Sequence, residues 1–292
     1  MRALITGCAQ NCAPWLPAVL ANVERLRSLC SSSRVLLLEN DSSDASVELI
    51  RHYGHSQPGV HALGFAGLNR RLPAKTVRLA HLRNTALAWL EAHGGWASVD
   101  LLVVLDLDGV NAAPWDLAQL QAALQWWQTQ PAAAGLFANQ LGPYYDLWAL
   151  RHSRLCPDDV WAAMLRLHGE RPELSDAELL EQVYRPRQFV LEPHQPPLEV
   201  DSAFGGLAFY SAAWLARSQA RYCGERPLGW QGAEGERWLR WQCCEHVALH
   251  RQLRRSGGRL WIHPALINWD TRAAAAAGMA PNPAGWRHLS LG

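Results

Sequence analysis

The sequence predicts an α/β protein with a mostly parallel sheet that is flanked by helices. Apolar runs typical of strands alternate with amphipathic stretches of helical spacing from the N-terminus to about residue 140, which is the order that winds a parallel sheet. The apolar runs are continuous rather than alternating, as in strands buried on both faces. With 292 residues, of which 49% are hydrophobic, the chain can bury a full core.

The first half of the chain contains most of these elements. A helix is expected over residues 16–26, where apolar side chains recur at helical spacing. The polar run 40–44 is typical of a turn and helix cap, and should open a second helix that continues through residue 50. The remaining expectations are strands at 2–6, 34–39, 60–65 and 101–105, and a helix at 76–92.

The second half has a less regular pattern. Seven prolines interrupt residues 141–200, which we expect to form a partly helical insertion or lid, with helices at 158–168 and 175–184. The expected strands on either side are 135–138, 207–210 and 259–263, with a helix over 237–255. The tail 271–292, rich in alanine, is expected to be loosely ordered.

Composition excludes several classes of protein. The formal net charge is +1 and there is no basic run, which argues against a nucleic-acid partner. No apolar stretch reaches the roughly 18–20 residues that span a bilayer, and the first residues do not resemble a signal peptide. The 7 cysteines lack the paired spacing of a disulfide framework and are interpreted as reduced thiols. A cytoplasmic protein without a transmembrane anchor is expected.

Polar side chains gather where the predicted parallel strands end, and such sheets bind ligands beyond their carboxyl ends. The run Asp106-Leu107-Asp108 directly follows the most apolar strand, so its two carboxylates should project to the same side. Two such groups suit Mg²⁺ or Mn²⁺, which would bridge the phosphates of a nucleotide. The alternative is a pair of exposed turn aspartates. Two other strand ends carry Thr6-Gly7 and Glu39-Asn40-Asp41.

Further candidates lie outside these strand ends. Arg83, followed by Asn84 within a helix, either pairs with a carboxylate or faces a diphosphate in bidentate geometry. The paired glycines Gly205 and Gly206 either admit a ligand close to the backbone or form a tight turn. His263 ends the last predicted strand, and as a neutral imidazole it could reach Asp108 and ligate a metal, or be structural.

The ordered set of motifs resembles the metal-dependent GT-A glycosyltransferases. Within them it is most similar to the capsule-associated α-1,3-mannosyltransferases of fungi and their bacterial relatives. The resemblance covers residues 2–270, and the motifs that carry it are residues 39–44, 79–84, 106–108, 137–140, 144–151, 202–206 and 244–246.

The resemblance implies one GT-A domain over residues 1–270, with a nucleotide-binding half 1–140 and an acceptor half 141–270. It implies a nucleotide-diphosphate sugar as donor and Mn²⁺ or Mg²⁺ as cofactor. The implied metal ligands are Asp106 and Asp108, and His263 is added from its place at a strand end. The candidate catalytic carboxylates, which would stabilise positive charge on the sugar, are Asp146, Asp201 and Glu245. The other implied donor-binding residues are Thr6, Gly7, Glu39, Asp41, Arg83, Asn84, Gly205 and Gly206, and the acceptor-binding residues are Tyr145, Trp148 and His246.

The predicted activity is transfer of a sugar from a UDP- or GDP-sugar to a glycan or lipid-linked acceptor, in surface polysaccharide synthesis. A lipid-linked acceptor would bring the protein to the inner face of the membrane as a peripheral contact. Two alternatives stay open. A sugar-nucleotide pyrophosphorylase would need a basic phosphate loop after the first strand, where residues 6–12 carry no Lys or Arg. A non-catalytic carbohydrate-binding protein would use some of the 15 tryptophans.

Overall fold

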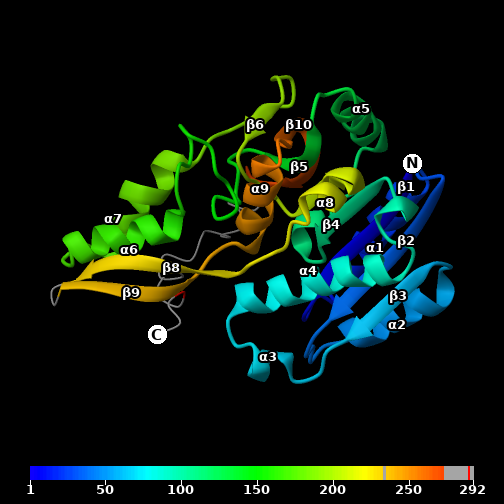
Figure 1. Ribbon diagram of the computed structural model, residues 1–292, viewed down its shortest axis with the longest axis horizontal. Helices are drawn as coiled ribbons and strands as arrows, with labels where there is room; N and C mark the ends of the chain where they lie inside the picture. The colour runs from blue at the N-terminus through cyan, green and yellow to red at the C-terminus, as the bar shows by residue number, and fades with distance from the viewer. Residues whose placement is uncertain (233–234, 273–288, 290–292) are drawn as a thin grey trace.

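A computed structural model describes residues 1–232, 235–272 and 289, whose strands form one large sheet with helices on both faces and a separate two-stranded hairpin (Figure 1). In spatial order the sheet strands are β3 (Val60–Gly64), β2 (Ser32–Glu39), β1 (Arg2–Ala9), β4 (Leu101–Asp106), β7 (Leu207–Ser211), β5 (Ala133–Leu141), β10 (Arg259–Asp270) and β6 (Leu198–Val200). The predicted α/β class is confirmed.

The sheet is mostly parallel. Strands β3, β2, β1 and β4 pair in parallel, and β5 pairs in parallel with β10. Strand β7 runs antiparallel between β4 and β5, and β6 is antiparallel to β10 at the edge. A strand at 207–210 was expected, but its reversed direction was not. Because β7 enters from the opposite end, the glycines that precede it lie beside the carboxyl end of β4.

Alternate residues of each strand point to opposite faces, so the sheet has two apolar cores. On one face Val35 and Leu37 of β2 pack with α1 (Leu16–Arg27), α2 (Ser46–Ser56) and α5 (Leu117–Gln128). On the other face Leu36 and Leu38 pack with α4 (Lys75–Ala92), α8 (Ala212–Ser218) and α9 (Glu245–Arg255). The helices expected at 16–26 and 76–92 are therefore confirmed to within one residue at each end. The helix expected after the polar run 40–44 is also present, and it continues past residue 50 to Ser56. A short helix, α3 (Leu68–Arg71), precedes α4.

The segment 141–200 is partly helical, as predicted. It contains α6 (Val160–Glu170) and α7 (Asp176–Leu179), the latter continuing into a π turn over Leu180–Tyr184. Strands β8 (Glu225–Gly232) and β9 (Gly235–Gln242) form the hairpin, which lies beside α6 and α7 away from the blue N-terminal half of the sheet (Figure 1). Leu228 and Trp241 of the hairpin pack against Ala162 of α6.

Two sequence-based predictions about the second half were wrong. Residues 237–242 form part of β9 instead of the start of a helix, because their backbone pairs with β8. Side chains are covered only toward the end of this strand: Trp238 is 71% exposed and Trp241 is 1% exposed. The last strand runs on past Pro264 to Asp270, since irregular pairing with β5 accommodates the proline.

The tail predicted over 271–292 lies mostly outside the described residues. In the described ranges, no helix combines the length and apolar composition that crossing a membrane requires.

Candidate functional site

A cleft of about 480 Å³ opens at the carboxyl ends of β1 and β4. Its walls come from the segment that follows β1, the first turns of α4, the segment 145–148 and the start of α9. Eight of the residues proposed from the sequence line this cleft, although the first and the last are 163 positions apart in the chain. They are Arg83, Asp106, Asp108, Tyr145, Asp146, Trp148, Glu245 and His246.

Asp106 and Asp108 hold two carboxylates in this cleft. Asp106 is the last residue of β4, and Asp108 caps a short 3₁₀ turn by accepting a hydrogen bond from the Val110 N–H at 3.2 Å. Burial raises the pKa of Asp106 to about 7; the positive charge of Arg83 opposes this shift, and the negative charge of Asp108 adds to it. The pair therefore concentrates negative charge that a cation would relieve.

Arg83 is buried in the wall of the cleft, with 4% of the residue exposed. Its Nη2 lies 3.2 Å from Asp106 Oδ1, its Nε lies 3.3 Å from Glu245 Oε1, and its guanidinium stacks over the Phe204 ring at 4.8 Å. The two carboxylates raise its pKa above the ordinary value in spite of burial. Nη1 has no hydrogen-bond partner in the described part of the chain. The placement of Arg83 therefore agrees with both interpretations from the sequence. Its ion pairs fit a structural role, and its unpartnered Nη1 fits an anion ligand.

Three buried amide side chains that were not recognised as positioning groups form a hydrogen-bonded network with the backbone of Asp106 and of the turn before β7. Asn111 donates to the carbonyl oxygens of Asp106 at 2.9 Å and Gly206 at 2.7 Å. Asn268 of β10 donates to Asn111 Oδ1 and to the Gly205 carbonyl oxygen, at 3.0 and 2.7 Å. Gln140 donates to Asn268 and to the same carbonyl. Their contacts span up to 157 positions of the chain, so no local pattern identifies them.

Gly205 and Gly206 form the tight turn that precedes β7. Both have positive φ, +64° and +82°. A Cβ on Gly206 would lie 2.6 Å from Val110 Cγ1, and one on Gly205 would lie 2.8 Å from the Ala138 carbonyl oxygen. Protein atoms fill the space beside both glycines, which supports a packing role over close approach by a ligand.

The segment after β5 presents Asp146 and two aromatic side chains to the cleft. Asp146 accepts hydrogen bonds from the Gly205 N–H at 3.0 Å and the Ala149 N–H at 3.2 Å. Burial raises its pKa, and those two hydrogen bonds oppose the shift. Trp148 is half-buried, and its indole N–H has no partner within the described ranges. The segment thus offers an apolar ring face and a carboxylate within one pocket.

His246 belongs to a buried chain of hydrogen bonds. Its Nδ1 lies 3.1 Å from the Tyr210 hydroxyl, which lies 2.8 Å from His250 Nε2, and His250 Nδ1 lies 2.8 Å from the Ser202 hydroxyl. Burial lowers the pKa of both histidines, that of His250 to about 3, with help from the charge of Arg83. His246 is therefore a neutral ring, stacked on Phe204 with centroids 3.9 Å apart.

Besides Gly205 and Gly206, five donor-site candidates do not line the cleft. Thr6 and Gly7 lie inside β1, which is longer than expected, so residues 8–12 reach the cleft instead. Glu39 accepts from the Ser42 N–H at 2.8 Å. Asp41 accepts from the backbone N–H groups of Gly67 and Asn69, which lower its pKa and fix the loop before α4. Asn84 exchanges hydrogen bonds with the backbone of Tyr222.

Asp201 and His263 are also separated from the two aspartates. Asp201 lies in a second cleft and forms an ion pair with Arg254 at 2.9 Å. His263 packs against Trp126 of α5, with ring centroids 5.3 Å apart, and its Nδ1 accepts from the Ala265 N–H. Among the described residues, no group of three His, Cys, Asp or Glu side chains forms a metal cage. The structure thus does not bring His263 to Asp108.

No known family model and no curated protein matches the sequence. Similar solved structures include a mannosyltransferase from Pyrobaculum calidifontis in complex with GDP-Man and Mn²⁺, with 16% identity, TM-score 0.49 and coverage of 92% of this chain and 56% of that chain. TarS from S. aureus has 10% identity and TM-score 0.49, covering 92% and 60%. Glucosyl-3-phosphoglycerate synthase from Mycobacterium tuberculosis, in complex with UDP, has 12% identity and TM-score 0.39, covering 92% and 69%. This chain spans less than two thirds of the length of the first two.

Proposed function

We propose that the chain is a metal-dependent glycosyltransferase of the GT-A type, which transfers a sugar from a UDP- or GDP-sugar to an acceptor hydroxyl. The observation that carries the proposal is the shared cleft of Asp106, Asp108 and the buried Arg83 at the carboxyl edge of a parallel sheet. That edge is where open α/β sheets bind ligands. Carboxylates for a cation and a guanidinium for an anion together suit a nucleotide diphosphate.

The two aspartates fit a divalent cation of the Mg²⁺ or Mn²⁺ type. Mg²⁺ is commonly bound by one or two carboxylates together with substrate phosphates and water, and needs no full protein cage. Burial raises the pKa of Asp106, and repulsion by the charge of Asp108 raises it further. A cation between the two carboxylates would relieve this repulsion. When bound, the metal would supply positive charge to the departing diphosphate.

The residues around the metal pair have separate roles in this proposal. Transfer breaks the bond between the sugar C1 and a phosphate oxygen and forms a bond from C1 to the acceptor oxygen. The acceptor proton passes to the Asp146 carboxylate or to an oxygen of the departing diphosphate. Arg83 offers Nη1 to the departing diphosphate. Asp146 faces the sugar or the acceptor hydroxyl, and Trp148 offers a ring face for stacking. Glu245 forms an ion pair with Arg83 and holds its guanidinium in place.

The acceptor class and the pathway follow from the sequence resemblance to the capsule-associated enzymes. We propose a glycan or lipid-linked glycan acceptor in surface polysaccharide synthesis, with the protein in the cytoplasm or at the inner face of the membrane. Against a pyrophosphorylase, residues 8–12, which line the cleft after β1, include no Lys or Arg to hold a triphosphate.

Nucleotide binding tests the proposal. UDP, GDP, CMP and dTDP are compared by thermal shift, each with Mn²⁺ and with EDTA, on wild type and Asp108→Asn. A ligand at about 100 times its dissociation constant stabilises the folded state by about 2.7 kcal/mol. We expect a metal-dependent shift with UDP or GDP that Asp108→Asn abolishes. Glu48→Gln, which removes one negative charge from an exposed position of α2, is the matched control and should keep the shift.

Absence of a shift with every nucleotide would refute donor binding. A shift that persists in EDTA and in Asp108→Asn would refute the metal role of the aspartates. A carbohydrate-binding protein would show neither shift and would be stabilised by sugars alone.

A further inference from the structure

A second cleft, of about 940 Å³, lies on the other side of α9 from the first. The two clefts share this helix as a wall, since Cys244, Glu245 and His246 line the first while Cys243, Val247 and Ala248 line the second. The second cleft is strongly charged. Its lining contains six arginines and four carboxylates: Arg151, Arg226, Arg251, Arg254, Arg255 and Arg259, with Asp158, Asp159, Asp201 and Glu225.

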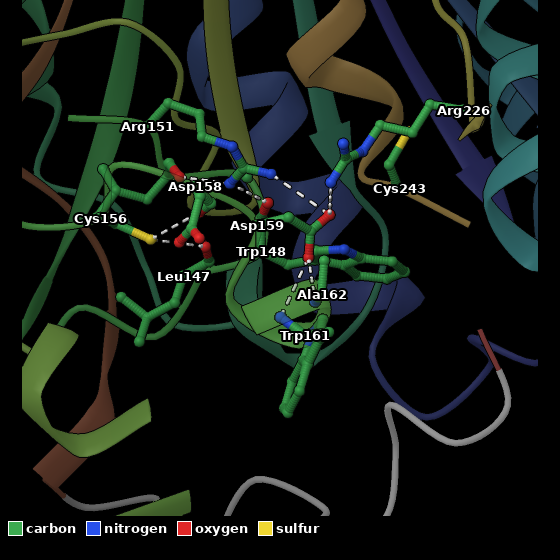
Figure 2. Close-up of polar contacts among 12 residues, drawn as sticks. Leu147, Trp148, Arg151, Cys156, Asp158, Asp159, Trp161, Ala162, Arg226 and Cys243 are labelled. Carbon is green, nitrogen blue, oxygen red and sulfur yellow. Dashed lines mark hydrogen bonds and ion pairs between the residues drawn. The ribbon is translucent and has the colours of Figure 1, made fainter. Parts of the chain in front are cut away.

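The carboxylates of this cleft already have cationic partners. Figure 2 shows Arg151 and Arg226 directed at Asp159 from two sides, at 3.5 and 4.0 Å. Asp159 also caps α6 through the N–H groups of Trp161 and Ala162, both at 3.1 Å, and is almost completely buried. The other three pair with arginines as follows: Asp158 with Arg166 and Arg187, Asp201 with Arg254, and Glu225 with Arg240.

Two of the arginines have no such partner. Arg251 and Arg255 are exposed and form no hydrogen bond or ion pair with any residue in the described ranges. By contrast, Arg254 and Arg259 are both held by Glu199, at 3.0 and 2.6 Å. The uncompensated positive charge of the second cleft therefore lies on two side chains of α9, Arg251 and Arg255.

The spacing of Arg251 and Arg255 is unfavourable for the helix alone. Like charges at positions i and i+4 repel each other and destabilise a helix. The helix dipole favours cations in the last turn, which accounts for Arg255 but not for Arg251 one turn earlier. A bound anion between them would turn this repulsion into attraction, and two guanidinium groups match the oxygens of a phosphate in bidentate geometry.

We propose that the second cleft binds a phosphate group through Arg251 and Arg255. We further assign this phosphate to the acceptor, a step that rests on the glycosyltransferase function proposed above. The shared wall of α9 would then hold a phosphate-bearing acceptor beside the sugar donor. The same chemistry is available from a soluble phosphate monoester or from a lipid-linked one.

Binding of a phosphomonoester in two forms tests this inference. Glycerol 3-phosphate is titrated by calorimetry, and vesicles of phosphatidylcholine with and without phosphatidic acid are tested by co-sedimentation. Both are done in EDTA without nucleotide, which removes metal-dependent binding in the first cleft, and any phosphate held there by Arg83 should be the same in wild type and in variants of the second cleft. We expect wild type to bind at least one of the two phosphate forms. Arg251→Gln/Arg255→Gln should weaken that binding by about tenfold or more.

A matched control keeps the change of net charge the same. Arg25→Gln/Arg51→Gln removes two exposed arginines from α1 and α2 that have no ion pair with described residues, and should bind like wild type. Arg251→Lys/Arg255→Lys keeps the charge but loses the forked geometry, and should bind with intermediate affinity. Since both arginines are exposed, thermal melting should show that each variant folds.

The outcomes separate the two proposals. Binding of glycerol 3-phosphate identifies a soluble source, and binding only to phosphatidic acid vesicles identifies a lipid source; either supports the site. Equal binding by wild type and Arg251→Gln/Arg255→Gln, equal weakening by the control pair, or no binding of either probe to wild type would overturn it. If wild type binds phosphate in the second cleft but binds no nucleotide in the first, the glycosyltransferase function is refuted and the phosphate site is still supported.

Discussion

Arg83 of α4 and Glu245, the first residue of α9, form an ion pair of 3.3 Å in which each side chain is only 5% exposed. Removing one partner of a buried pair leaves the other charge uncompensated, which costs about 3–5 kcal/mol. We therefore expect Arg83→Gln to lower the free energy of unfolding by that amount, measured by urea denaturation without metal. Arg2→Gln, which breaks the exposed pair with Asp100, should cost at most about 1 kcal/mol. Similar costs for the two variants would contradict this account.

Buried neutral histidines should make stability depend on pH. In the folded state burial lowers the pKa of His250 to about 3 and that of His246 well below its ordinary value, while in the unfolded chain both titrate near about 6.5. Below pH 6.5 the unfolded state therefore binds protons that the folded state does not, and stability falls as the pH falls. Each histidine contributes a slope of up to about 1.4 kcal/mol per pH unit.

The variant His250→Gln isolates one of these contributions. Urea unfolding is measured at pH 7, 6 and 5 for wild type and variant, and the slopes are compared rather than the absolute stabilities. The variant should lose one histidine's share of the slope, since only His246 is left of the buried pair. An unchanged slope would show that His250 is not a source of the pH dependence.

Gly206→Ala tests the turn that precedes β7. The new Cβ would meet Val110 at 2.6 Å and the Tyr145 hydroxyl at 3.2 Å, at a φ of +82°. We expect a loss of more than about 1 kcal/mol in unfolding free energy, from strain and crowding together. Gly67→Ala has a similar φ, +70°, but open space around the Cβ, and should cost less. A smaller loss for Gly206→Ala than for Gly67→Ala would contradict the packing role.

Asn111→Ala tests whether the buried amides position the two aspartates. Its side chain donates to the carbonyl oxygens of Asp106 and Gly206, of which Gly206 also accepts from the Asp106 N–H. Losing these two buried hydrogen bonds should cost about 1–3 kcal/mol in all. We expect lower stability and a weaker Mn²⁺-dependent nucleotide shift. Asn139→Ala is an equally buried control with two similar bonds, to the Leu191 and Pro264 carbonyls, and should lose stability while keeping the nucleotide shift. Loss of the shift in both variants would argue against a positioning role.

The central part of the site could be predicted from the sequence because it depends on local signals. A continuous apolar run followed by Asp106-Leu107-Asp108 identifies both a buried strand and its polar end. Arg83 could be identified as a charged residue on an apolar helix face, although the sequence does not indicate that two carboxylates hold it.

Other parts depend on partners that are far away in the sequence. Asn111 and Asn268 acquire their roles only when β10 and the turn after β4 meet, 157 positions apart. Arg237–Gln242 contains no turn signal that separates it from a helix, and its strand structure comes from pairing with β8. Asp201 and His263 also lie next to apolar runs, as Asp108 does, but they lie outside the cleft of Asp108. The sequence does not show at which end of the sheet each of these segments is placed.

The position of β7 also constrains how the protein folds. Strands β4 and β5 are complete by residue 141, yet they never pair with each other, because β7 fills the space between them and starts only at Leu207. A chain that has emerged only as far as residue 200 thus leaves one edge of β4 and both edges of β5 unpaired, since β10 starts only at Arg259. Unpaired edges of this kind attract other strands. Closure requires contacts of high sequence separation, which form slowly. Assembly of the cleft therefore waits for the second half of the chain, and the facing edges of β4 and β5 stay open until β7 is in place.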